Sequence, residues 1–169
     1  MTAEGRDILS AVAIGVGASL LMDLWNLLLK LAFGIPSLNY CLLGRWICHM
    51  PGGTFRHASI AHARQKPGEC TIGWIAHYAI GAGLALGLLV VASREWLVRP
   101  ALVPALLWGV GTVVFPLLVM QPALGLGVAS SKTASPTQAR LKSLATHMVF
   151  GVGLYSSANG LNYVLRAFG

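Results

Sequence analysis

The sequence has few charged residues, and this scarcity excludes most classes of soluble protein. Only 10% of its 169 residues are charged and only 5 are Asp or Glu, whereas 56% are apolar. A soluble globular domain carries roughly 25% charged and 45–50% apolar residues. We therefore predict an all-α integral membrane protein that forms a single membrane domain over residues 1–169.

Cysteine is also scarce, and its spacing predicts no disulfide framework. Cys41, Cys48 and Cys70 form no CxxC pair, and all three fall between the first and second apolar segments. We expect this loop to face the cytoplasm, where thiols stay reduced. Structural disulfides are therefore not expected.

The common catalytic and nucleotide-binding motifs are missing. No GKS or GKT follows Gly125 and Gly127, and the chain contains no HExxH and no Ser/His/Asp triad pattern. The net charge of +7 comes with no nucleic-acid motif either. We expect the basic residues to contact anionic lipid headgroups of the bilayer, and we expect no nucleic acid as a partner.

In place of such motifs, the chain has long apolar segments. A helix that crosses a bilayer needs about 20 mostly apolar residues, and four segments meet this requirement. They cover about 8–32, 72–92, 100–120 and 143–165. We predict a four-transmembrane-helix bundle whose two long loops cover about 33–71 and 121–142.

The basic residues predict an orientation. Eight lie on the side of the two long loops: Lys30, Arg45, Arg56, Arg64, Lys66, Lys132, Arg140 and Lys142. Four lie on the other side: Arg6, Arg94, Arg99 and Arg166. By the positive-inside rule the long loops face the cytoplasm and both termini face the periplasm or exterior.

The chain repeats the pattern His-x-x-x-Gly-x-Gly-Leu, once from His77 and once from His147. The tripeptide GVG also recurs, at 15–17 and at 109–111. These echoes predict two repeated helical hairpins related by a pseudo-twofold axis along the membrane normal. The alternative is that the glycines only permit close helix packing, which leaves the histidines unexplained.

Polar residues inside membrane helices are costly, so their positions suggest a site. Ser19, Asp23, Asn26 and Lys30 share one face of the first predicted helix, at the helical period of 3.6 residues. At 1.5 Å per residue, Asp23, His77 and His147 all lie on the order of 10 Å below the same surface. These three are the candidate catalytic and metal-ligating residues.

One carboxylate and two imidazoles are compatible with several chemistries. They can ligate Zn, Fe, Mn or Cu with room left for water or substrate. Asp23 can instead orient a histidine as a proton-handling pair, or His77 and His147 can hold a haem between them. The structural alternative is that Asp23 pairs with Lys30 or with a histidine and only holds the helices together.

The first loop suggests a second layer above this site. Residues 39–50 predict a short interfacial helix that ends at Pro51, with Arg45 and His49 on one face. With Arg56 and His57 they would form a basic lid for an anionic headgroup, or the helix simply rests on the membrane. The candidate ligand-binding residues are Asn26, Arg45, His49, His57 and Gln121.

Several short stretches together resemble a known family. They are MDLW at 22–25, SLNY and GRW with His49 in the first loop, MQP at 120–122 and RLKSLATH at 140–147. They are similar to the uncharacterised bacterial membrane family called domain of unknown function 2938. The resemblance covers nearly the whole chain and implies a small multi-pass protein of the bacterial inner membrane. It implies no particular activity.

Three classes of function remain open. The first is a membrane enzyme or a metal- or haem-binding protein that uses Asp23, His77 and His147, acting on a small or anionic lipid-like ligand. The second is a small proton- or cation-coupled transporter that works as a homodimer. The third is an accessory subunit of a larger membrane complex. Because the polar groups cluster at one depth near one surface, we favour the first class.

Overall fold

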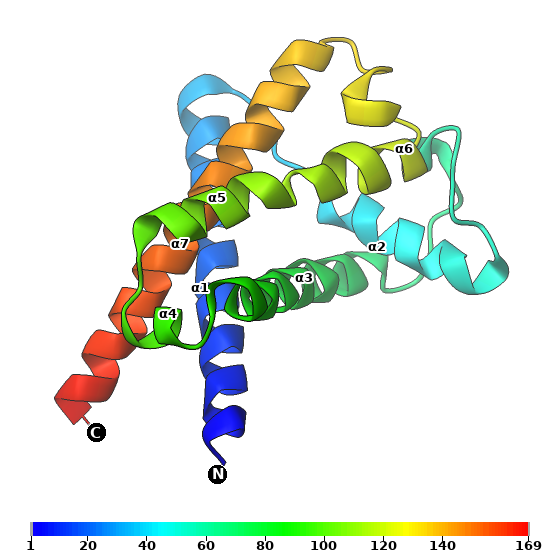
Figure 1. The fold of residues 1–169 in the computed structure, drawn as a ribbon. Helices are drawn as coiled ribbons and strands as arrows, with labels where there is room; N and C mark the ends of the chain where they lie inside the picture. The colour runs from blue at the N-terminus through cyan, green and yellow to red at the C-terminus, as the bar shows by residue number, and fades with distance from the viewer. Residues whose placement is uncertain (1, 169) are drawn as a thin grey trace. The chain divides into compact units, whose positions relative to one another are not determined.

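The computed structural model describes residues 2–168, and within that range the regular structure is helical, with no strand (Figure 1). The helices are α1 (Ala3–Phe33), α2 (Tyr40–His49), α3 (Glu69–Ala92), α4 (Glu95–Val98), α5 (Leu102–Thr112), α6 (Gln121–Ala123) and α7 (Pro136–Phe168). Short 3-10 turns cover Met50–Gly52, Ile60–His62 and Val128–Ser130, and a π-helical turn covers Pro116–Met120. The prediction of an all-α protein is confirmed.

Three stretches within residues 2–168 are long and apolar enough to cross a membrane: Glu4–Phe33, Glu69–Ala92 and Leu102–Ala123. The fourth predicted span, 143–165, lies inside the helix α7 but is not among them. Its helical structure is confirmed, whereas its passage through a membrane stays a prediction. The difference lies in the polar residues of α7, which include Ser156, Ser157, Asn159 and Asn162.

The helix ends follow local sequence signals. The hydroxyl of Thr2 accepts a hydrogen bond from the backbone nitrogen of Gly5 (3.2 Å) at the start of α1, and α1 ends at Gly34, whose φ is 67°. Asn39 caps α2 by accepting from the backbone nitrogen of Cys41 (3.0 Å). The short helix predicted in the first loop is therefore confirmed as a helix.

The chain divides into two compact units. Unit 1 comprises Met1–Pro36, Tyr78–Gly111 and Thr146–Gly169. Unit 2 comprises Ser37–His77 and Thr112–Ala145. The candidate residues are thus divided, because Asp23 and His147 lie in unit 1 and His77 lies in unit 2.

Glycine residues allow the helices of unit 1 to approach closely. A Cβ on Gly15 of α1 would lie 2.5 Å from the carbonyl oxygen of Gly81 on α3, and a Cβ on Gly109 of α5 would lie 2.6 Å from the Cα of Gly151 on α7. Similarly close approaches join Gly17 to Ser157, Gly153 to Ala18, and Gly87 to Trp108. At Gly15, Gly109 and Gly153 the backbones therefore pack directly against one another, as small residues permit in membrane helices.

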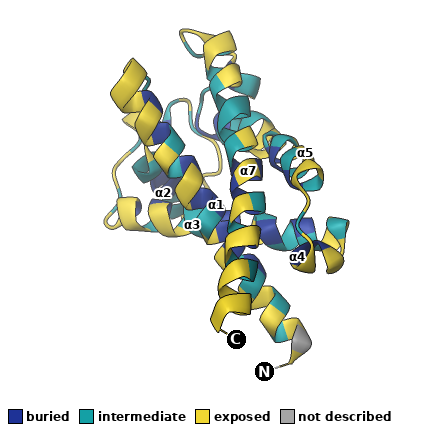
Figure 2. Cartoon of the chain, turned by 90° about the vertical axis from the view of Figure 1, so that its left-hand side faces the viewer, coloured by how far each residue is buried: buried dark blue, intermediate teal, exposed yellow. Residues whose placement is uncertain are grey.

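The core of unit 1 is apolar, and so is much of its surface. Phe150, Leu154, Leu88 and Ile14 are almost completely buried at the centre of the core. Large apolar side chains also cover the outer faces of α1 and α3, for example Leu24 (54% exposed). Figure 2 shows exposed residues along the outward faces of these helices. An apolar surface of this extent suits contact with lipid better than contact with water.

Unit 2 is built around the crossing of α2 with the first turns of α3. A Cβ on Gly44 would overlap the carbonyl oxygen of Glu69, and a Cβ on Gly73 would overlap that of Tyr40, so only glycine fits at either position. One turn away, Cys41 and Cys70 form a disulfide. The expectation that these two cysteines stay reduced is wrong for the structure. They lie 29 residues apart in sequence, and only the helix crossing brings them together.

Candidate functional site

The polar centre of unit 1 is a pair formed by Asp23 and Tyr78. The phenol hydroxyl of Tyr78 on α3 donates a hydrogen bond to a carboxylate oxygen of Asp23 on α1, at 2.9 Å. Both residues lie within candidate membrane spans. A hydrogen bond that joins an ionisable group to a second helix inside a membrane marks a candidate functional site.

The other polar residues of α1 are arranged around this pair. Ser19, one turn before Asp23, is buried with its hydroxyl against Gly81 of α3. Asn26 is buried too, and its amide donates to the carbonyl of Met22 (2.9 Å). Lys30 is exposed. The predicted polar stripe of α1 is therefore internal from Ser19 to Asn26 and leaves the interior at Lys30.

Two further polar atoms of unit 1 are buried at one level between α1 and α7. They are the indole nitrogen of Trp25 and the hydroxyl of Thr146, and neither has a hydrogen-bond partner within residues 2–168. The helices run antiparallel and approach at Ala18 and Gly153. Trp25 lies seven residues after Ala18 and Thr146 seven before Gly153, which is close to two helical turns in each case. These two polar atoms therefore lie near the level of Asp23.

The two repeated histidines make different contacts. His77 stacks on Tyr40 within unit 2, with ring centroids 4.2 Å apart and an interplanar angle of 22°. His147 in unit 1 hydrogen-bonds the backbone of Gly109, at the crossing of α5 and α7. Residues 2–168 contain no group of three or more His, Cys, Asp or Glu that could hold a metal ion. The metal site predicted from Asp23, His77 and His147 is therefore unsupported.

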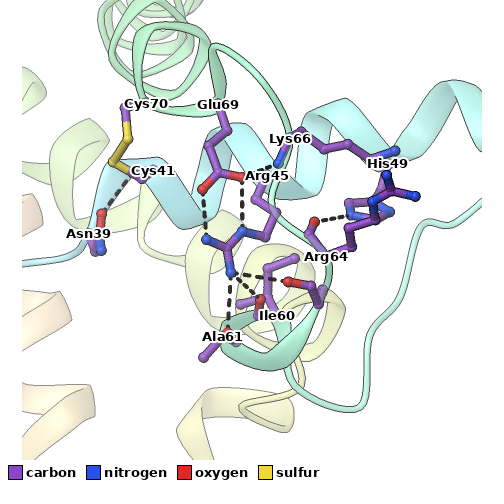
Figure 3. A network of polar contacts seen from close by, with 11 residues as sticks. Asn39, Cys41, Arg45, His49, Ile60, Ala61, Arg64, Lys66, Glu69 and Cys70 are labelled. Atoms are coloured by element: carbon purple, nitrogen blue, oxygen red, sulfur yellow. Dashed lines mark hydrogen bonds and ion pairs between the residues drawn. A yellow bond between two sulfur atoms is a disulfide. The ribbon is translucent and has the colours of Figure 1, made fainter.

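The strongest polar contact of unit 2 joins Arg45 of α2 to Glu69 of α3 (Figure 3). The guanidinium donates to both carboxylate oxygens, at 2.6 and 2.9 Å, and the two side chains are only 7% and 10% exposed. It also donates to the carbonyls of Ile60, Ala61 and Ala63 at 3.2–3.3 Å. The hydrogen bond to Glu69 raises the pKa of Arg45 against the opposing effect of burial. Arg45 is therefore an internal cation that organises unit 2.

His49 and His57 lie together in unit 2. Their ring centroids are 5.0 Å apart, with planes at 79°. The Nε2 atom of His49 lies 2.9 Å from the carbonyl oxygen of Arg64 (Figure 3). Burial, and then the charge of His49, lower the pKa of His57. Of the residues predicted to form a basic lid, this pair is brought together, whereas Arg45 is engaged by Glu69.

Gln121 is a buried residue of unit 2. Its side-chain oxygen accepts a hydrogen bond from Ser130 (2.8 Å), and its side-chain nitrogen lies 3.4 Å from the hydroxyl of Ser143. Ala129 and Ser130 adopt positive φ values of 49° and 59°, which are strained for residues other than glycine. The buried side chain of Gln121 thus stabilises the irregular turn at Ala129 and Ser130.

Comparison with known proteins identifies the family. The model of the family described as "Protein of unknown function (DUF2938)" matches residues 12–160, which is most of the chain. The chain belongs to this family. The match includes Asp23, Arg45, Gln121 and both repeated histidines. No curated protein and no solved structure matches the chain.

Several contributors to these sites were missed by reasoning from sequence. Tyr78 contacts Asp23, and Trp25 and Thr146 have buried polar atoms near its level, yet the sequence alone shows each of them only as an ordinary residue of an apolar helix. Glu69 was missed because its partner Arg45 is 24 residues away and no local pattern joins them. Its position offered the only signal, since an acidic residue at the start of an apolar segment is unusual in a chain with so few acids.

Proposed function

We propose that this protein is a small membrane protein that binds a proton or a small monovalent cation at Asp23, and that it couples this binding to transport. The observation that carries the proposal is the hydrogen bond of 2.9 Å between Asp23 and Tyr78 on two candidate membrane spans. Ionisable residues within membrane helices commonly mark ion pathways and proton relays. The Tyr78 hydroxyl stabilises the carboxylate and fixes its orientation.

The unpartnered indole nitrogen of Trp25 and hydroxyl of Thr146 support the proposal. A buried polar group without a hydrogen-bond partner costs about 1–3 kcal/mol, so such groups usually meet water or a ligand. A donor from α1 and a hydroxyl from α7 near the level of Asp23 offer contacts to a small polar solute or to water. These contacts favour transport over metal binding at Asp23, because residues 2–168 contain no group of three or more His, Cys, Asp or Glu that could hold a metal ion.

Transport is tested with the full-length protein reconstituted into lipid vesicles that carry a pH-sensitive dye. A proton or sodium gradient should dissipate faster than in protein-free vesicles, and Asp23→Asn should abolish the difference. Tyr78→Phe should reduce the rate by a smaller factor because the carboxylate remains.

The matched control is Asp7→Asn on the same helix. Asp7 pairs with Arg94 at 2.6 Å, and its side chain is partly exposed. This variant should transport at the wild-type rate. Equal rates in wild-type and Asp23→Asn vesicles would contradict the proposal.

The proposed architecture is a duplicated helical hairpin that dimerises. It is supported by two glycine crossings at equivalent positions of the repeat, namely Gly15 with Gly81 and Gly109 with Gly151. A dimer is part of the proposal because a few helices alone enclose little space for a pathway.

For localisation we propose the bacterial inner membrane, with an orientation opposite to the one that the charges predict. The disulfide between Cys41 and Cys70 supports this orientation, because disulfides form in oxidising compartments such as the periplasm. In the proposed orientation the two cysteines face the periplasm and the termini face the cytoplasm. As evidence for the orientation, the covalent disulfide carries more weight than the bias of eight basic residues against four. Arg45 also contributes less to this bias than an exposed loop residue would, because its side chain is buried against Glu69.

A further inference from the structure

The His49 and His57 rings of unit 2 are positioned by main-chain contacts. His49 is the last residue of α2, and its carbonyl accepts a hydrogen bond from the backbone nitrogen of Thr54 (3.3 Å). The backbone nitrogen of His57 donates to the carbonyl of Ala123 in α6 (2.8 Å). Both ends of the segment that joins the two histidines are therefore attached to helices, which holds the rings near each other.

The contact between His49 and Arg64 fixes the tautomer of His49. A carbonyl oxygen can only accept, so the Nε2 atom of His49 must carry the hydrogen that it donates to Arg64 at 2.9 Å. In the neutral ring the Nδ1 atom then keeps its lone pair. Histidines that bind metals are commonly oriented in this way, by donating their other ring nitrogen to a backbone carbonyl.

His57 supplies the second observation. Its Nε2 atom is buried and has no hydrogen-bond partner within residues 2–168. A nitrogen in this state needs a partner to offset its loss of water. The lowered pKa of His57 keeps the ring neutral near pH 7, the form that binds metal.

We propose that His49 and His57 form a binding site for a divalent transition-metal cation that prefers imidazole ligands, such as Zn²⁺ or Cu²⁺. Two ring nitrogens about 2.0–2.1 Å from the metal would supply the protein ligands, and water would fill the remaining positions. The buried cation of unit 2 does not oppose binding, because Glu69 neutralises Arg45. The site is independent of Asp23.

The test uses the full-length, metal-free protein in detergent, titrated with ZnCl₂ in a calorimeter. One equivalent should bind at pH 7.5, and His49→Ala and His57→Ala should each weaken binding at least tenfold. His62→Ala is the matched control, because His62 is exposed and its Nδ1 atom lies 3.0 Å from the hydroxyl of Ser59, its neighbour in sequence by three residues. His49→Gln separates folding from ligation, since its amide can still donate to the Arg64 carbonyl but offers no imidazole nitrogen.

Electron paramagnetic resonance of the Cu²⁺-loaded wild-type protein gives a readout that needs no variant. Hyperfine coupling to two imidazole nitrogens is the expected result. Coupling to no imidazole, the absence of stoichiometric binding, or equal affinity in wild type, His49→Gln and His57→Ala would each overturn the proposal. Binding that is lost in Asp23→Asn but kept in His57→Ala would assign the metal to unit 1 instead.

Discussion

Arg45 is the residue on which unit 2 most depends, because its guanidinium meets a carboxylate and three backbone carbonyls in a buried position. Removing one member of a buried ion pair leaves the other charge uncompensated and typically costs about 3–5 kcal/mol. Arg45→Met and Glu69→Leu should each lower the free energy of unfolding by roughly this amount.

The double variant tests whether the two residues act as a pair. Arg45→Met with Glu69→Leu should be clearly less destabilised than the sum of the single variants, because no buried charge remains. It should not regain full stability, because the carbonyls of Ile60, Ala61 and Ala63 lose their donor. Chemical unfolding in detergent measures the free energy of unfolding of the wild type, the two single variants and the double variant. Strictly additive effects would show that Arg45 and Glu69 do not act as a pair.

His57 predicts how the stability of unit 2 depends on pH. Burial, followed by the charge of His49, lowers the pKa of His57 below its ordinary value of 6.5. The folded state therefore binds fewer protons than the unfolded chain, and the free energy of unfolding falls as the pH drops through 6.5. Thermal unfolding at pH 8 and pH 5 should show this loss. His57→Gln should flatten the pH dependence, and an unchanged slope in that variant would refute the assignment.

At the scale of single residues, the sequence identifies which groups are unusual but not what they meet. Asp23 stands out because carboxylates are rare in apolar helices, whereas its partner Tyr78 depends on how α1 and α3 pack. The same holds for Cys41 and Cys70, since pairing of cysteines 29 residues apart is decided by the helix crossing between them.

At the scale of elements, periodicity and capping predict the helices well. The sequence predicts a helix over residues 39–50 that ends at Pro51, and α2 covers Tyr40–His49. The structure adds that Asn39 caps this helix. A membrane span in α7 does not follow from periodicity in the same way. Its apolar residues are interrupted by Ser156, Ser157, Asn159 and Asn162, and one of these, Asn162, donates to the carbonyl of Leu97 (2.7 Å) in unit 1.

The glycine crossings lead to a prediction about α7. A Cβ on Gly151 would lie 2.7 Å from the carbonyl oxygen of Ala105 and 2.9 Å from the Cα of Leu106, and backbone atoms of α5 cannot move aside cheaply. Gly151→Ala should destabilise unit 1 by about 1–3 kcal/mol, the usual cost of overpacking.

Gly160→Ala is the control on the same helix. A Cβ at Gly160 would meet nothing within 4 Å, so this change should be neutral or slightly stabilising. Thermal unfolding of both variants in detergent compares them. A Gly160→Ala variant as unstable as Gly151→Ala would show that close packing against α5 does not explain the effect.

At the scale of the whole molecule, the orientation in the membrane is the least predictable property from sequence. The charge bias and the disulfide give opposite answers, because the first is a statistical tendency and the second depends on tertiary structure. If unit 2 lies in the periplasm, Cys41 and Cys70 should resist thiol reagents in intact cells until a reductant is added. The Cys48→Ser background removes the remaining free thiol. Both cysteines labelling without reduction would restore the orientation predicted from charge.

If Asp23 binds a proton or cation between α1 and α3, infrared spectroscopy of the reconstituted protein should detect the change in its carboxyl group. A pH titration should reveal the carbonyl stretch of a protonated carboxyl group that is lost in Asp23→Asn and kept in Asp7→Asn. Tyr78→Phe should shift its frequency, because the hydrogen bond of 2.9 Å to the carboxylate is removed. A spectrum that is identical in wild type and Asp23→Asn throughout the titration would contradict the account.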